Sequence, residues 1–187
     1  MKTTNKRDAE VITLGSGDVF YQEFDEAVGM PDVTAICNKE YLLGRISGGA
    51  TLEYKGDWYT AKDDTGKVEK TLITDEEVTF KTGIITWNGK TLDVLCATGR
   101  VTESNGLRYV KIGGIANDNR KSYVIVFHHT DKVDGDIWIM IRGKNQGSIK
   151  LAFAKDKETT VDAEFTAMAQ DDDGTLITYA EEIKANN

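Results

Sequence analysis

Two stretches of alternating polar and apolar residues, separated by a polar segment, dominate the hydrophobic pattern of the chain. Ala50, Leu52 and Tyr54 alternate with polar residues, and Val78 and Phe80 share one face of the second stretch. The pattern predicts a long hairpin over residues 47–87, in which two strands are joined by a polar segment at residues 55–70. Loops longer than about 12 residues are uncommon in compact domains unless they are functional or mobile. This segment is either a solvated loop or an arm that docks on another surface.

Shorter apolar runs fill the rest of the chain. Turn residues such as Asn105-Gly106 and Asp173-Gly174 separate them, and residues 25–41 show no clear pattern. A single helix is expected over residues 89–98, because Asn88 can cap it and Gly99 follows as a stop signal. Strands are predicted at 11–14, 19–24, 107–112, 123–129, 137–142, 149–153, 161–169 and 176–179. The predicted fold is mainly β: two packed antiparallel sheets, as a sandwich or small barrel, with one flanking helix and a long protruding hairpin.

Two of these strands are apolar on both faces. Residues 123–127 and 137–141 contain hardly any polar side chain, whereas antiparallel strands usually keep one face in water. Leu92 and Leu95 of the helix can cover one patch. The other face is covered either by more of the same chain, which is the preferred interpretation, or by a neighbouring subunit.

The bulk composition indicates one globular domain, and the expected division is a flexible arm at 1–10, a domain at 11–180 and a flexible tail at 181–187. No apolar run reaches the roughly 20 residues that a membrane span needs, and the polar first ten residues lack a signal-peptide core. We therefore expect a protein that is made and folded in the cytosol. Cys37 and Cys96 stand alone, and we expect reduced thiols in preference to a disulfide or a metal site.

The net charge of −8, from 23 basic and 31 acidic residues, argues against specific nucleic-acid binding, because affinity for phosphates comes mainly from Lys and Arg. The excess is uneven: residues 155–187 hold three Lys against nine Asp or Glu, which amounts to −6. A solubilising surface is a simpler explanation than a dedicated acidic lining.

Candidate chemistry is sparse. His128 and His129 are adjacent in a predicted strand, so they point to opposite faces and cannot jointly bind one metal. Asp131, Asp134 and Asp136 lie nearby, but structural or surface histidines are the preferred interpretation. Residues 171–174 lack the alternating ligands of a calcium loop, and no nucleophile elbow or phosphate loop is present. No catalytic residue, cofactor or metal site is predicted.

Several whole segments are similar to one known family. SGGATLEYKGDWYTAKDD, WNGKTLDVLCATGRV, KIGGIANDNRKSYVIVFHH and LAFAKDKETTVDAEFTAMAQDDDGTLITY resemble major tail tube proteins of long-tailed (siphovirus-like) bacteriophages. The resemblance covers about residues 11–182. It implies a structural subunit without enzymatic activity, which self-assembles into stacked hexameric rings that form the conduit for DNA ejection.

The same resemblance implies partners and an interface. The partners would be other copies of the chain, a tape measure protein, and tail terminator or baseplate proteins, in a virion tail assembled in the host cytoplasm. Genomic DNA would pass through without specific binding, and no membrane is involved. In that family a long hairpin reaches neighbouring subunits, and here that arm holds Lys55, Asp57, Trp58, Tyr59, Lys62, Asp63, Asp64, Lys67 and Lys70. Trp58 and Tyr59 would be its main anchors, the balanced charges could form ion pairs between subunits, and the terminal arms would become ordered, if at all, on stacking.

Two other classes of function stay open. One is a monomeric β-sandwich module that binds carbohydrate through Trp58, Tyr59 and nearby carboxylates. The other, far less favoured, is a hydrolase that uses His129 and Asp131.

Overall fold

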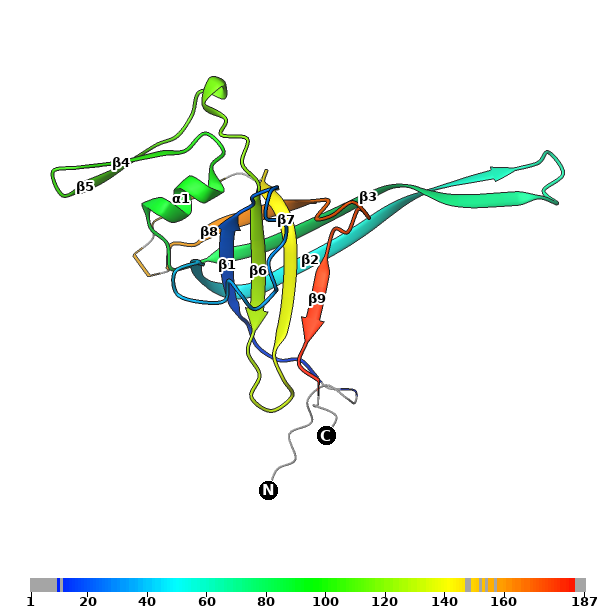
Figure 1. Ribbon diagram of the computed structural model, residues 1–187, viewed down its shortest axis with the longest axis horizontal. Coiled ribbons are helices and arrows are strands. Elements are labelled where there is room, and N and C mark those ends of the chain that lie inside the picture. The colour runs from blue at the N-terminus through cyan, green and yellow to red at the C-terminus, as the bar shows by residue number, and fades with distance from the viewer. Residues whose placement is uncertain are drawn as a thin grey trace.

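The structure is a computed structural model that describes residues 10, 12–146, 149–151, 153, 155–156 and 158–183 (Figure 1). Its strand content of 48% confirms the prediction of a mainly β protein. The described residues hold one α-helix, α1 (Gly89–Leu95), and one short 3-10 helix, η1 (Ile115–Asn117). The strands are β1 (Asp18–Glu23), β2 (Leu42–Lys62), β3 (Glu69–Ile84), β4 (Arg100–Ser104), β5 (Leu107–Lys111), β6 (Tyr123–His129), β7 (Ile137–Asn145), β8 (Val161–Met168) and β9 (Thr178–Glu181).

Seven of these strands form one antiparallel sheet that closes on itself. The strand order is β6-β1-β2-β3-β8-β7-β9, and β6 also pairs with β7, so six strands form a ring. The long strand β7 makes this closure possible: it pairs with β6 along one edge, and with β9 and then β8 along the other. The expectation of two packed sheets is therefore wrong, and the barrel alternative describes the main sheet. The second sheet is only the β4–β5 hairpin.

The interior of this ring is the main hydrophobic core. Phe80 of β3 and Phe165 of β8 are almost fully buried there, together with Val19 of β1 and Ile125 of β6. Helix α1 adds Val94 and Leu95, and Leu92 packs against the same cluster, as the sequence predicts. The cluster joins strands from across the whole sheet, so its burial holds the ring together.

A second cluster covers the outer face of β1, β6 and β7. Phe20, Val124, Val126 and Met140 pack there against Ile36, which belongs to the segment between β1 and β2. This segment has no regular strand, and it is the part of the sequence that shows no clear pattern. Both faces of β6 are thus covered within one chain, which confirms the preferred interpretation for this strand, whereas Trp138 and Ile139 of β7 stay partly exposed.

Some predicted boundaries need correction. The helix ends at Leu95 and not at residue 98, because Cys96 already has an extended backbone, whereas the predicted cap is present: the Asn88 side chain accepts a hydrogen bond from the Lys90 N–H at 2.8 Å. Sequence patterns miss β4, although the Asn105-Gly106 turn that joins it to β5 is found, with both φ values positive. Described residues 12–14, 149–151 and 153 form no strand, contrary to expectation.

The predicted ends of the domain fall partly outside the described residues. The expected N-terminal arm lies there except for Glu10, and residues 184–187 of the expected C-terminal tail lie there too. The tail boundary at 181 is two residues too early: Glu181 belongs to β9, and the Glu182 N–H donates to the Asp136 carbonyl at 2.9 Å.

Candidate functional site: a protruding arm

Strands β2 and β3 continue far beyond the barrel. The pairing of β2 with β1 ends at Arg45, and the pairing of β3 with β8 covers only residues 79–84. From Tyr54↔Val78 outward to Lys62↔Glu69 the two strands pair only with each other among the described residues. Nine residues of β-strand span about 30 Å at roughly 3.3 Å per residue, and Figure 1 shows this ribbon extending away from the body. We call residues 54–77 the arm. The expected polar loop at 55–70 is thus mostly a regular two-stranded ribbon.

The turn at the end of the arm explains why the polar segment folds back as a ribbon. The Asp63 N–H donates to the Val68 carbonyl at 3.0 Å, and the Asp63 carboxylate accepts from the Val68 N–H at 2.8 Å. The same carboxylate accepts from the N–H and the hydroxyl of Thr65, and these bonds lower the pKa of Asp63. Gly66 supplies the positive φ of the turn, a conformation that costs glycine little. Asp63, expected at an interface, therefore has a structural task in the turn.

One face of the arm presents a small aromatic cluster. Gly56 lies in its middle: a Cβ there would be 2.9 Å from the Ile73 Cδ1 and 3.4 Å from the Trp58 Nε1, so the glycine leaves room for both side chains. Tyr54 completes the cluster, and its hydroxyl donates to Glu76 at 2.5 Å. The exposed fractions are 54% for Tyr54, 65% for Trp58 and 37% for Ile73. We call this the aromatic face.

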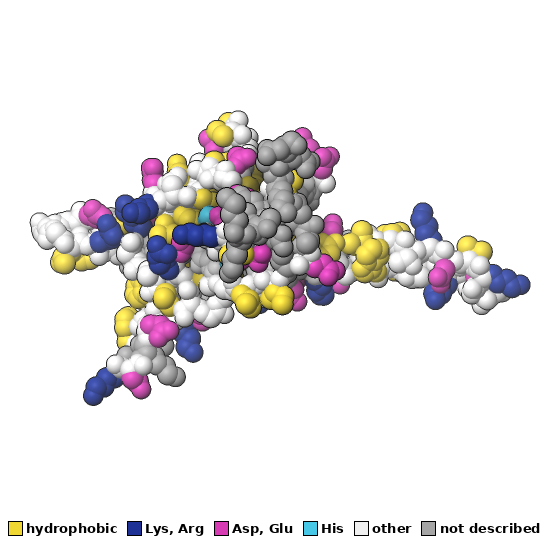
Figure 2. Space-filling view, turned by 90° about the horizontal axis from the view of Figure 1, so that it is seen from below, with side chains coloured by type: hydrophobic (Ala, Val, Ile, Leu, Met, Phe, Trp, Pro, Cys, Tyr) yellow, Lys and Arg dark blue, Asp and Glu magenta, His cyan; other side chains and the backbone are white. Residues whose placement is uncertain are grey.

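The opposite face carries acidic and apolar pairs in succession. Asp57 lies opposite Asp75 in the ribbon, and Tyr59, two residues further along β2, lies opposite Leu72. Tyr59 and Leu72 are both exposed. Since successive residues of a strand point to opposite sides, Trp58 and Tyr59 are on different faces. We call this the acidic face. The arm therefore offers apolar surface on both faces, and Figure 2 shows hydrophobic side chains along one side of it.

The predicted charged residues of the arm are used in different ways. Lys55 lies 3.8 Å from Asp57, and Lys62 lies 3.2 Å from Glu69, in pairs whose side chains are more than half exposed. Such exposed pairs contribute about 0–1 kcal/mol each. Asp64, Lys67 and Lys70 are exposed and form no ion pair with another described residue. The balanced charges are thus partly paired within the arm itself.

Sequence reasoning missed the apolar residues of the returning strand. Leu72 and Ile73 complete the two faces opposite Tyr59 and Trp58, and Val68 is 69% exposed beside the turn. The signal was present, because Leu72 and Ile73 are adjacent apolar residues in a polar stretch. Each fits one face of a two-stranded ribbon and neither fits a solvated loop.

Both histidines have contacts within the body of the protein. The His128 Nε2 lies 2.8 Å from the Asp136 carboxylate, and its ring stacks on Trp138 with 5.0 Å between centroids. His129 is only 4% exposed, and its Nδ1 contacts the Ser16 carbonyl at 2.7 Å. No group of three or more His, Cys, Asp or Glu side chains that could hold a metal occurs among the described residues.

The two cysteines lie in different parts of the body. Cys96 is buried after α1, and Cys37 is half-buried in the segment that covers β6. Burial raises the pKa of the Cys37 thiol to about 11 and also raises that of Cys96. Neither thiol is therefore activated as a nucleophile.

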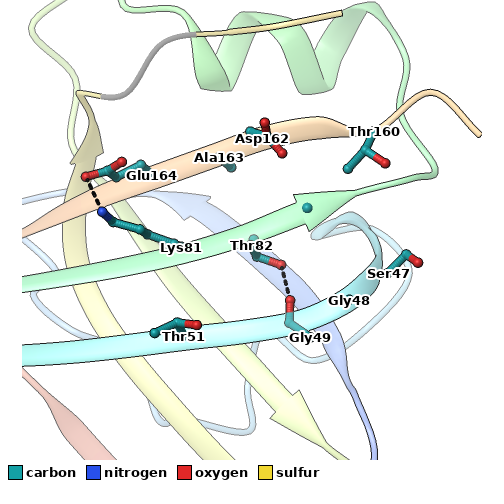
Figure 3. A pocket seen from close by; sticks show the side chains of 11 residues that line it. Ser47, Gly48, Gly49, Thr51, Lys81, Thr82, Thr160, Asp162, Ala163 and Glu164 are labelled. Carbon is teal, nitrogen blue, oxygen red and sulfur yellow. Dashed lines mark hydrogen bonds and ion pairs between the residues drawn. The ribbon is translucent and has the colours of Figure 1, made fainter. Parts of the chain in front are cut away.

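A polar hollow of about 470 Å³ lies at the root of the arm, where β2, β3 and β8 meet (Figure 3). Gly48 and Gly49, both with positive φ, form a bulge in β2 at its rim, as expected for glycines inside a strand. Lys81 and Glu164 form an ion pair of 3.2 Å beside it. The described residues that line this hollow include no aromatic side chain, so they offer no stacking platform for a sugar ring.

A scan against protein-family models gave no match, and no curated protein proved significantly similar in sequence. Among the described residues, no helix has the length and apolar character needed to cross a membrane. The arm therefore stands as the candidate site on its own geometry.

Proposed function

We propose that this protein is a structural subunit of a bacteriophage tail tube and that it self-assembles into stacked hexameric rings. The observation that carries the proposal is the arm: a ribbon of about 30 Å that exposes Tyr54, Trp58 and Ile73 on one face and Tyr59 and Leu72 on the other. Several segments of the sequence resemble major tail tube proteins, and this resemblance is the reason for interpreting the arm as a contact between tail tube subunits.

The arm has physical reasons to seek a partner. A two-stranded ribbon in water is at best marginally stable alone, and its outer edges carry unpaired backbone groups that can extend another sheet. Burying apolar surface yields roughly 25 cal/mol per Å², and aromatic side chains such as Trp58 dominate the energetics of many interfaces. In a stack of rings, neighbouring copies would lie on both sides of the arm. Their contacts would together cover both of its faces.

The charge of the chain suits a conduit for DNA. A net charge of −8 gives phosphates little to bind, so DNA can move past the protein without adhering. In the proposed assembly the partners are other copies of the chain, with a tape measure protein and terminator or baseplate proteins at the ends. No enzymatic step is part of the proposal.

The carbohydrate-binding alternative loses its main argument. It relies on Trp58 and Tyr59 acting together, but these residues lie on opposite faces of the ribbon. The hydrolase alternative relies on His129, which is buried and held by the Ser16 carbonyl.

Electron microscopy tests the proposal. We expect negative-stain images of the concentrated protein to show hollow tubes or six-fold rings. In a matched variant, residues 58–74 are removed and Asp57 is joined to Asp75 by Asn-Gly, which keeps the register of the remaining strands. This variant should fold and remain dispersed. Tubes of normal appearance from the shortened protein would contradict the role of the arm.

A further inference from the structure

The molecule has a second protrusion, on the side of the body away from the arm. The β4–β5 hairpin projects beyond α1 in the opposite direction to the arm (Figure 1). Its two strands pair only with each other among the described residues, so both of its edges are open. One face packs on the start of the helix, since a Cβ at Gly89 would lie 2.8 Å from the Arg108 Cδ and 2.9 Å from the Val110 Cγ2.

The other face of this hairpin carries a basic pair beside an apolar residue. Arg100 lies directly opposite Lys111, and the next pair on the same face is Thr102 with Tyr109. All four side chains are exposed, and Tyr109 is 45% exposed. No acidic partner for Arg100 or Lys111 occurs among the described residues. Like charges directly opposite each other destabilise a strand pair.

The acidic face of the arm has the reverse arrangement. Asp57 lies directly opposite Asp75, and the next pair on that face is Tyr59 with Leu72. Among the described residues, the Asp57 carboxylate pairs with the exposed Lys55 at 3.8 Å, and the Asp75 carboxylate accepts a hydrogen bond from the Glu76 N–H. The two carboxylates of this pair also repel each other across the strands. Within one copy, Lys55 offsets this repulsion only in part.

We propose that the β4–β5 hairpin of one copy packs against the acidic face of the arm of a second copy. The basic pair Arg100/Lys111 would then meet the acidic pair Asp57/Asp75, and the apolar residues beside each pair would cover one another. Both repulsive pairs are relieved by the same contact, which is the charge complementarity that selects one partner and one register. The inference rests on the proposed function, since it names the surface of the second copy that receives the arm.

The geometry of this contact is head-to-tail. The two surfaces are different and lie on opposite sides of the body, so each copy offers both and the contact repeats from copy to copy. Such heterologous contacts close into rings when the rotation between copies allows it. The contact also differs from one through the aromatic face, which stays available to another neighbour.

Charge reversal tests the contact by sedimentation velocity over a concentration series. One variant carries Asp57→Lys with Asp75→Lys, and the other carries Arg100→Asp with Lys111→Asp. Each should need at least about a tenfold higher concentration than the wild type to assemble, because like charges now meet across the contact. An equimolar mixture should assemble like the wild type, and so should a chain with all four changes. Higher salt should weaken wild-type assembly, as screening predicts.

A matched control exchanges an ion pair on the other face of the arm. Lys62→Glu with Glu69→Lys keeps the net charge and should leave assembly unchanged. The contact is refuted if each reversed variant assembles like the wild type, or if the mixture of the two folded variants does not assemble. If the wild type stays monomeric at every concentration, the tail tube proposal is overturned as well. If the wild type assembles and the charge-reversed variants assemble equally well, only this contact is overturned.

Discussion

Strands β2 and β3 run through both the barrel and the arm, but their apolar side chains are buried in the barrel and exposed in the arm. Val78 and Phe80 of β3 are at most 2% exposed in the barrel, whereas Ile73, a few residues earlier in the same strand, is 37% exposed in the arm. The difference arises because β1 and β8 flank β2 and β3 only in the barrel. The barrel buries most of its large apolar side chains within one chain. The arm does not, so we assign the stability of the monomer to the barrel and association to the arm.

The largest effect should follow from a cavity in the barrel. Phe165 is fully buried between strands, and Phe165→Ala removes most of a side chain that its neighbours cannot replace. We expect the free energy of unfolding to fall by about 3–5 kcal/mol. Urea denaturation followed by circular dichroism measures this change, and a loss below about 1 kcal/mol would mean that the core lies elsewhere.

The matching change in the arm should leave the monomer intact. Trp58 is 65% exposed, so Trp58→Ala should change the free energy of unfolding of the monomer by no more than about 0.5 kcal/mol. The same change should raise the concentration needed for assembly about tenfold or more, as for an aromatic anchor at an interface. Light scattering over a dilution series reports the second effect. A large loss of monomer stability without any change in assembly would contradict the assignment of monomer stability to the barrel and of association to the arm.

The sequence predicts the barrel better than the arm, for a physical reason. Strands β6 and β8 are found almost to the residue, because alternating or doubly apolar patterns report burial within the chain. In the arm, apolar Trp58, Tyr59, Leu72 and Ile73 stand among charges, so the pattern has no buried face to report. The ribbon is held by backbone pairing and by the Asp63 turn, neither of which has hydrophobic periodicity.

The sequence left a sandwich and a barrel open, and it could not decide whether the sheet closes. Closure depends on β7 sharing one edge between β8 and β9, which is a matter of length and register and not of composition. The cover over Val124 and Val126 comes from a segment without regular strands, so its role becomes visible only once Ile36 is seen in contact with them. Within the candidate site, Trp58 and Tyr59 were found because exposed aromatic residues in a polar segment are unusual, and their partners on β3 were missed.

A smaller effect is expected at the junction between barrel and arm. Gly48 has a φ of 79°, and a Cβ there would meet no atom within 4 Å, so Gly48→Ala tests backbone strain without a clash. The left-handed conformation costs other residues about 1–2 kcal/mol, and we expect the free energy of unfolding to fall by that amount. Unchanged stability would show that the bulge can rearrange. The direction of the arm relative to the barrel would then not be fixed by this bulge.

The smallest effect concerns the alkylation rate of thiols. It compares Cys37 in the body of the protein with a cysteine introduced into the arm. With its pKa raised to about 11 by burial, Cys37 should react slowly with iodoacetamide at pH 8, because little thiolate is present. A cysteine introduced by Tyr59→Cys in the exposed arm should react at least about tenfold faster in the monomer. Mass spectrometry of timed samples gives both rates. Equal rates would contradict the contrast between a closed body and an open arm.

The most direct test of the central claim is sedimentation velocity of the wild-type protein beside the variant that lacks residues 58–74. We predict that the wild type shifts from a monomer to large species as its concentration rises, while the shortened chain remains a monomer throughout. A wild type that sediments as a monomer at every concentration, or a shortened chain that assembles equally well, would contradict the assignment of association to the arm.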